Sequence, residues 1–234
     1  MKNLFFALAA LGLYATAARA DDGQACSISA DTVRNLQAQL GPVVNLPDAN
    51  GGIFKPNLMW SAIVDRNGIL CSVAKTGDAW PGSRAIAIAK AETANDFSNS
   101  KLALSTANLY APTQPGGSLY GLNNSNPFNA FYNKETTSGG DGSGVGRNPG
   151  GIITFGGGVA LYSGGQVIGG LGVSGDSSCA DHAIAYRMRR LAGLDTIPGG
   201  VGPGGTDNIA YLAPTDPPNT GFKQPHCFPS DITP

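Results

Sequence analysis

The sequence predicts an α+β protein, a single domain in which an antiparallel sheet of about five strands has helices packed against it. Strand-like runs at 58–65 and 68–75 are joined by "DRNG", a strong hairpin signal. Glycine pairs separate three more short runs, which favours an antiparallel meander over crossover connections. These runs are 151–155, 158–163 and 166–175.

Four segments have helical patterns, and most begin at a residue that can cap a helix. The segments, with their expected N-caps, are 29–40 (Ser29 or Asp31), 83–97 (Ser83), 100–111, and 177–194 (Ser177 or Ser178). The alanine-rich 83–97 helix carries a face of small side chains. We therefore expect another element to approach it closely.

Residues 1–20 read as a cleaved signal peptide. Lys2 forms a positive n-region, an apolar stretch too short to span a bilayer follows, and Ala18-Arg19-Ala20 is a small-x-small cleavage site. We therefore expect a periplasmic or secreted protein. The expected domain covers 21–197, and a Pro- and Gly-rich tail covers 198–234.

Cleavage after Ala20 would leave 214 residues, with 13 basic and 16 acidic side chains. No basic stripe is present, which argues against nucleic acid as a partner, and no second apolar run could span a membrane. Residues 112–150 are rich in Gly, Asn, Ser and Pro, and they read as a long loop that is either disordered or a functional lid.

The mature chain keeps four cysteines, an even number that indicates disulfides in an exported protein. Zinc would favour close C-x-x-C pairs, whereas these cysteines stand at least 45 residues apart. Of the three possible connectivities we expect Cys26–Cys71 and Cys179–Cys227, because each bond would tie one terminus to the body of the protein.

Gly170, Gly172 and Gly175 spell G-x-G-x-x-G, the pattern of a dinucleotide-binding turn. That fold needs a second parallel strand after the helix, and the following "DTIPGGVGPGG" cannot supply one. The glycines are better explained by a bent strand and by another element that comes close to the backbone.

Two stretches together resemble the GlcG/HbpS family of heme-binding or heme-degrading domains. They are "SAIVDRNGILCSVAKTGDAWPGSRAIAIAKAETANDF" and "GGVALYSGGQVIGGLGVSGDSSCADHAIA". The resemblance covers about 120 residues, and it implies a profilin-like α+β domain that assembles as a homo-oligomer. It also implies heme, or a related small molecule, as the ligand.

The candidate site is a cleft between the sheet, the 83–97 helix and the glycine turn. Its ligand-binding residues would be Asp78, Ser83, Arg84, Lys90, Gly172, Ser174, Asp181 and His182. A carboxylate or heme propionate could bind at the start of the helix, because helix N-termini attract anions. His182 could ligate heme iron, or it could lie on the exposed face of the last helix. No metal site and no catalytic nucleophile are evident.

Three functions remain open. The first is an exported heme-type ligand-binding protein. The second is a cofactor-free lyase or isomerase of small carbonyl or aromatic compounds, with Lys90, Asp78 and Asp181 as acid–base groups. The third is an accessory subunit of a periplasmic redox system, with the 112–150 loop as its docking surface.

Overall fold

The computed structural model describes residues 24–130 and 144–234, so the expected signal peptide lies outside the described residues. Its four strands are β1 (Trp60–Asp65), β2 (Leu70–Lys75), β3 (Gly158–Ser163) and β4 (Gln166–Ser174). They form one sheet in the order β2-β1-β4-β3, and every neighbouring pair is antiparallel. Both predicted hairpins, β1–β2 and β3–β4, are confirmed.

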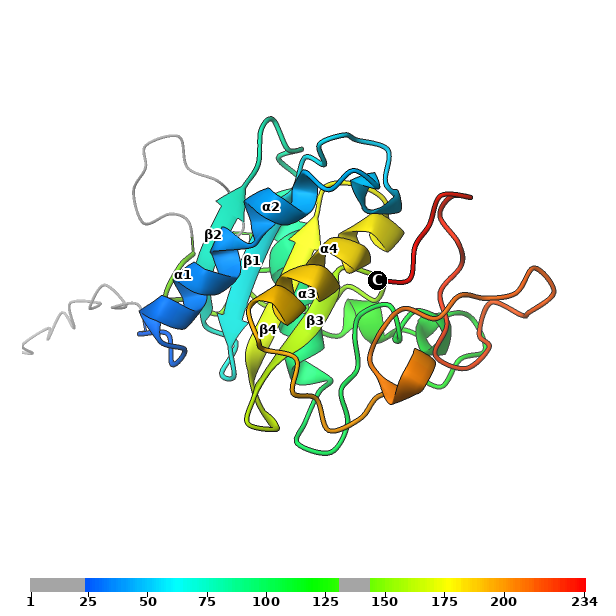
Figure 1. Cartoon of the computed structure of the whole chain (residues 1–234). Helices are drawn as coiled ribbons and strands as arrows, with labels where there is room; N and C mark the ends of the chain where they lie inside the picture. Colours follow the sequence, from blue (N-terminus) through cyan, green and yellow to red (C-terminus); the bar gives the residue numbers. More distant parts are fainter. Residues whose placement is uncertain (1–23, 131–143) are drawn as a thin grey trace, which may run out of the picture.

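Helices cover both faces of this sheet. The α-helices are α1 (Ala30–Ala38), α2 (Leu40–Val44), α3 (Ser83–Asp96) and α4 (Ser178–Leu191). Short 3-10 turns lie at Ala49–Gly51, Ala111–Thr113, Leu122–Asn124 and Pro203–Gly205. Helix α3 lies behind the sheet as drawn in Figure 1, whereas α1, α2 and α4 lie in front of it. The predicted α+β class is therefore confirmed.

The alternation of side chains along the strands creates two separate core layers. In β1, Ile63 joins the cluster under α1, α2 and α4, whereas its neighbours Ala62 and Val64 join the cluster under α3. All three side chains are fully buried. A strand buried on both faces needs apolar residues at successive positions, which explains the uninterrupted apolar run in this part of the sequence.

The glycines of β4 let α3 lie directly on the sheet. A Cβ atom at Gly170 would overlap the carbonyl oxygen of Ala91, and one at Gly172 would overlap that of Ala87. β4 is antiparallel to both of its neighbours, so no βαβ unit exists here. The interpretation of these glycines as positions of close backbone approach is therefore confirmed.

The expected fifth strand, 151–155, is wrong, because this segment forms no strand. Amide groups in and beside it bond to side chains instead of a neighbouring strand. Ile153 N–H donates to Thr93 Oγ1 on α3, and Gly156 N–H donates to Gln224 Oε1 in the C-terminal tail. These partners are distant in sequence, so strand periodicity gave no sign of them.

The helix expected over 100–111 is also wrong, since the segment forms no α-helix. Side chains compete for its backbone groups: Leu104 N–H donates to Ser98 Oγ, and Ser105 N–H donates to Asn108 Oδ1. In α3 the N-cap is Gly82, and Ser83 is the first helical residue rather than the cap.

The other expected helix starts are found in the structure. Ser29 caps α1 and Ser177 caps α4, each through a side-chain oxygen that accepts an amide of the first turn. The first helical segment ends earlier than expected, at Ala38, and the short helix α2 continues the chain. Pro42 lies in the first turn of α2, where a missing N–H is tolerated.

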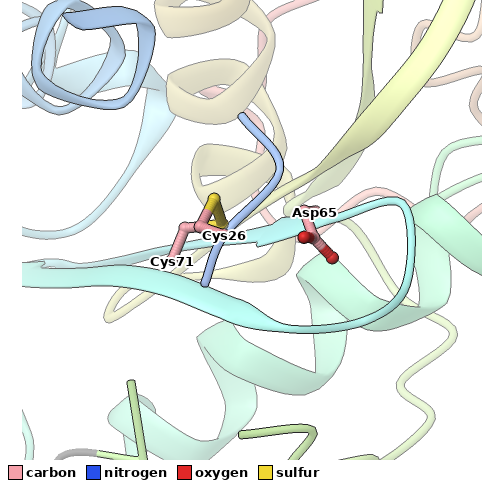
Figure 2. A group of neighbouring side chains, drawn as sticks. All are labelled: Cys26, Asp65 and Cys71. Carbon is pink, nitrogen blue, oxygen red and sulfur yellow. A yellow bond between two sulfur atoms is a disulfide. The ribbon is translucent and has the colours of Figure 1, made fainter. Parts of the chain in front are cut away.

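The structure contains both expected disulfides, Cys26–Cys71 and Cys179–Cys227. Figure 2 shows the first one, which joins the N-terminal segment to β2 beside Asp65. One oxygen of Asp65 accepts the amide of Ser27, and the other accepts two amides of the β1–β2 turn. Cys26, Cys71 and Asp65 thus hold the N-terminal segment against the sheet. The two sulfur atoms are already bonded to each other.

The C-terminal tail is tied to α4 by more than its disulfide. Arg189 and Asp207 form an ion pair with two N–O distances of 2.6 Å, and both side chains are buried. Backbone bonds also join the tail to the segment after α3, for example from Ala111 N–H to the carbonyl oxygen of Lys223. Within the described residues, no helix has the length and apolar character needed to cross a bilayer.

Candidate functional site

Two of the expected site residues, Lys90 and Asp181, contact each other inside the protein. Lys90 Nζ lies 2.6 Å from Asp181 Oδ2 and 3.1 Å from the carbonyl oxygen of Val173. The ring of Phe155 lies 4.9 Å from the same ammonium group. The other oxygen of Asp181 accepts the amide of Asp176. The side chains are 0% and 3% exposed, so solvent does not reach the pair.

The backbone around Gly157 makes this contact possible. Lys90 belongs to α3 and Asp181 to α4, and the two helices lie on opposite faces of the sheet. They meet beside the residues that precede β3. A side chain at Gly157 would collide with Lys90 Nζ, with Asp181 Cβ and with the carbonyl of Val173, and its φ of 124° also favours glycine.

Burial opposes the charge on both members of the pair. Desolvation lowers the pKa of the Lys90 ammonium, although the neighbouring Asp181 carboxylate counteracts it. Desolvation also raises the pKa of Asp181 to about 6, against the effect of Lys90. Shifts of this kind are found in acid–base catalysts, but they also arise in closed structural ion pairs. The absence of solvent access favours a structural role here.

His182 is fully buried on α4, so its expected alternative position on an exposed helix face is wrong. Ile209 N–H lies 3.0 Å from its Nε2 atom, and Asn208 Oδ1 lies 3.1 Å from the same atom. The ring stacks on Tyr186 with a centroid distance of 5.8 Å. Burial lowers the pKa of His182 to about 4, which keeps the imidazole neutral. The tail residues therefore occupy Nε2, whereas the buried Nδ1 atom has no hydrogen-bond partner among the described residues.

The residues at the start of α3 lie apart from this pair. Asp78 is exposed in the preceding turn, Ser83 is half-buried, and Arg84 is 2% exposed. Seven residues of helix, about 10 Å along the axis, separate Ser83 from Lys90. Asp176, which follows β4, accepts the amides of Ile53 and Phe54.

The two β4 residues of the predicted site, Gly172 and Ser174, are also inside the protein. Gly172 lies against the backbone of α3, and Ser174 is 6% exposed opposite Trp60 of β1. Of the predicted site residues, the structure brings Lys90 and Asp181 into contact, whereas those at the start of α3 lie apart from this pair. Most of the predicted site residues contact the protein interior and do not line an open cleft.

Glu92 on α3, which is not among the predicted site residues, is 2% exposed. Burial, with the nearby Asp96 and Asp65 carboxylates, raises the pKa of Glu92 to about 9, so the group is a neutral acid at pH 7. Its Oε1 atom has no hydrogen-bond partner among the described residues. One feature of the sequence could have pointed to Glu92: it is an acidic residue two positions after Lys90, within a run of mostly small side chains.

A surface cavity of about 560 Å³ lies between α4 and the segment after α2. It is lined by Leu46, Pro47, Asp48, Arg187, Arg190 and Leu191. The guanidinium of Arg187 holds Asp48 through two N–O contacts of 3.0 and 2.7 Å, and this hydrogen bonding lowers the pKa of Asp48. None of the expected ligand residues lines this cavity.

The second histidine, His226, has an accessible ring. Its side chain is 56% exposed, and its Nδ1 atom lies 3.3 Å from Asp231 Oδ2. The imidazole stacks on Tyr211 with a centroid distance of 3.9 Å and an angle of 15°. Asp231 also lies close to the sulfur atoms of the neighbouring disulfide, Cys179–Cys227, but the disulfide already uses these sulfurs.

A family model and several solved structures match this chain. The family described as haem degrading protein HbpS-like matches residues 57–189, which run from just before β1 almost to the end of α4. A crystal structure of a PduOC:heme complex is 26% identical with a TM-score of 0.52. The match covers 73% of this chain and 98% of that one.

A second solved structure, Klebsiella pneumoniae protein ORFY, is 22% identical with a TM-score of 0.52, over 74% of this chain and 95% of the other. At this identity the likeness shows a shared fold. A search of curated proteins found no significant match.

Proposed function

The chain belongs to the HbpS-like family, and from that membership we propose that it is an exported protein that binds heme. The observation that carries the proposal is the combination of the family match over 57–189 with the likeness to a structure described as a heme complex. That structure is matched over nearly its whole length, so the resemblance includes the complete fold of the relative rather than a fragment.

The side chains of this protein are compatible with heme. Heme iron takes imidazole, thiolate, thioether or phenolate ligands, and the chain presents an exposed imidazole at His226. The interior cluster around Lys90 and Asp181 is a poorer place for heme, because its side chains are buried and bonded to one another. When bound, heme would supply a redox-active iron, while the protein would hold and orient it.

Export is supported by two observations. The first twenty residues have the pattern of a signal peptide, and the structure pairs all four cysteines in disulfides. Disulfides persist in the periplasm and outside the cell, whereas cytosolic thiols are kept reduced. Mass spectrometry of protein isolated from the periplasm or culture medium should give an N-terminus at residue 21.

The test of heme binding is a titration of the purified, disulfide-bonded protein with hemin. We expect the Soret band of hemin to shift and sharpen, with saturation at one heme per chain. Serum albumin is a suitable positive control, and a small disulfide-bonded protein such as ribonuclease is a negative control. A spectrum identical to that of free hemin at all ratios would reject the proposal.

The lyase or isomerase alternative receives less support. It needs Lys90 and Asp181 to reach a substrate, but both side chains are enclosed. The docking role of the 112–150 loop and the homo-oligomer remain predictions. The described parts of that loop pack partly on the tail, as shown by the approach of Gly116 to Asn219.

A further inference from the structure

His226 carries the one imidazole that the described part of the chain presents to solvent. All four cysteines are in disulfides, and the thioethers of Met59 and Met188 are fully buried. The sequence contains only two histidines, and His182 is buried with Ile209 N–H at its Nε2 atom. If the chain binds heme, as proposed above, we infer that the Nε2 atom of His226 is the axial ligand of the iron.

The partner of His226 sets the correct tautomer for such a role. Asp231 Oδ2 lies 3.3 Å from His226 Nδ1, and it also accepts the amides of Cys227 and Phe228 at 2.6 and 3.1 Å. A carboxylate only accepts hydrogen bonds, so it keeps the imidazole proton on Nδ1. The lone pair therefore resides on Nε2, for which no described residue supplies a hydrogen bond. Metal-binding histidines commonly have such a carboxylate partner, which also makes the imidazole a stronger ligand.

The imidazole is also held in place. It stacks on Tyr211, whose hydroxyl donates to the carbonyl of Ile232 at 3.0 Å. The next residue, Cys227, is bonded covalently to Cys179 at the start of α4. A ligand that is fixed before binding loses little conformational entropy when the metal binds.

An exposed apolar side chain, that of Phe228, follows His226 by two positions in the sequence. Phe228 is 38% exposed, and its amide donates to the same carboxylate oxygen as the histidine. A porphyrin is a large apolar plane, and an exposed aromatic side chain on the same loop as the histidine would supply part of the apolar surface for it. The inferred site therefore combines one fixed ligand with apolar contact area, on a tail that lies outside the segment matched by the family.

The experiment compares the wild type with His226→Ala and His226→Gln in hemin titrations, with resonance Raman spectra of the ferrous complexes. We expect an iron–histidine stretching band in the wild type, which both variants lose, together with a decrease in affinity of about 10-fold or more. Tyr120→Phe is the matched control, because this ring is also exposed, at 68%. It should leave the affinity and the band unchanged.

Asp231→Asn tests the tautomer separately. Asparagine can still accept the two backbone amides, but it presents no carboxylate to the imidazole. We expect the iron–histidine band to move to lower frequency, with a loss of affinity of about 10-fold. Circular dichroism and melting curves check that each variant is folded, which we expect for the His226 variants because this side chain is 56% exposed, and for Asp231→Asn because asparagine keeps the size of the buried aspartate.

The outcomes separate this inference from the proposed function. If the wild type and the His226 variants bind hemin equally tightly and share the same band, the inference is rejected while heme binding stands. If the wild type leaves the hemin spectrum unchanged, both are rejected. A loss confined to the His226 variants supports both.

Discussion

Lys90 Nζ lies 2.6 Å from Asp181 Oδ2, and this buried contact joins two helices that cover opposite faces of one sheet. Removing one member leaves the other charge buried without its partner, which typically costs about 3–5 kcal/mol. We expect Lys90→Met to lower the free energy of unfolding by this amount in urea titrations.

The control for this ion pair is Arg34→Ala. Arg34 pairs with Asp31 on α1, where both side chains are mostly exposed, and the change should stay within about 0.5 kcal/mol. The double variant Lys90→Met/Asp181→Leu should recover part of the lost stability. A Lys90→Met protein as stable as the wild type would show that the pair contributes nothing.

Gly172→Ala should destabilise the protein strongly. The added methyl group would overlap the carbonyl oxygen of Ala87, so α3 would have to move away from the sheet. Overpacking of this kind costs about 1–3 kcal/mol, and a rigid backbone neighbour favours the upper end. Gly41→Ala is the control, because nothing lies within 4 Å of its Cβ position in α2. It should be neutral or stabilising by up to about 1 kcal/mol.

Glu92 should make the protein less stable as the pH rises. Its pKa is about 9 in the folded state, against an ordinary value of 4.5, so the folded state binds the proton more tightly. The stabilisation is complete below pH 4.5 and is lost as the pH rises towards 9. Glu92→Gln removes this dependence. Between about pH 4.5 and 7.5 its stability relative to wild type should increase by on the order of 4 kcal/mol in paired denaturation curves. Parallel curves across this range would contradict a buried neutral acid.

His182 should show the opposite dependence. Burial lowers its pKa from 6.5 to about 4, so the unfolded state binds the proton more tightly. Its contribution is complete above pH 6.5 and is lost as the pH falls towards 4. In NMR titrations the His182 Cε1–H signal should stay at its neutral position down to about pH 5. His182→Gln should serve to assign the signal, and a midpoint above about 6 would place the ring in solvent.

Loss of the Cys179–Cys227 disulfide should release the tail. The two cysteines are 48 residues apart, and a loop of this length corresponds to about 4 kcal/mol of chain entropy. We expect the double Cys→Ser variant to lose stability in this range and to be cleaved by trypsin within residues 198–234. The matched control is the double Ser variant of Cys26–Cys71, whose separation of 45 is similar. It should lose comparable stability but keep the tail resistant.

Local patterns in the sequence were sufficient to predict the hairpins and the main helices. The turn sequence "DRNG" predicted the β1–β2 hairpin, and the glycines of β4 predicted that another element lies close to this strand, which is α3. Lys90 and Asp181, which the sequence assigned to one candidate site, contact each other in the structure. Their enclosure could not be predicted, because it depends on Phe155 and on the backbone at Gly157, in a segment without a periodic pattern.

The segments that were predicted wrongly share one cause. The expected strand 151–155 and the expected helix 100–111 satisfy their backbone groups with side chains and tail carbonyls, many of them remote in sequence. Just after the expected strand, for example, Gln224 accepts the amide of Gly156 across 68 positions. Propensity and periodicity describe neighbours along the chain, so they do not report such partners.

The buried pair of Arg189 and Asp207 has a consequence for anyone who trims this protein. The family match ends at residue 189 and the expected domain at 197, yet the carboxylate that neutralises this guanidinium lies beyond both boundaries. A fragment cut at either boundary would carry an uncompensated cation into its interior. The minimal folding unit therefore extends past the homologous segment. Part of the Pro- and Gly-rich tail belongs to the core of the protein.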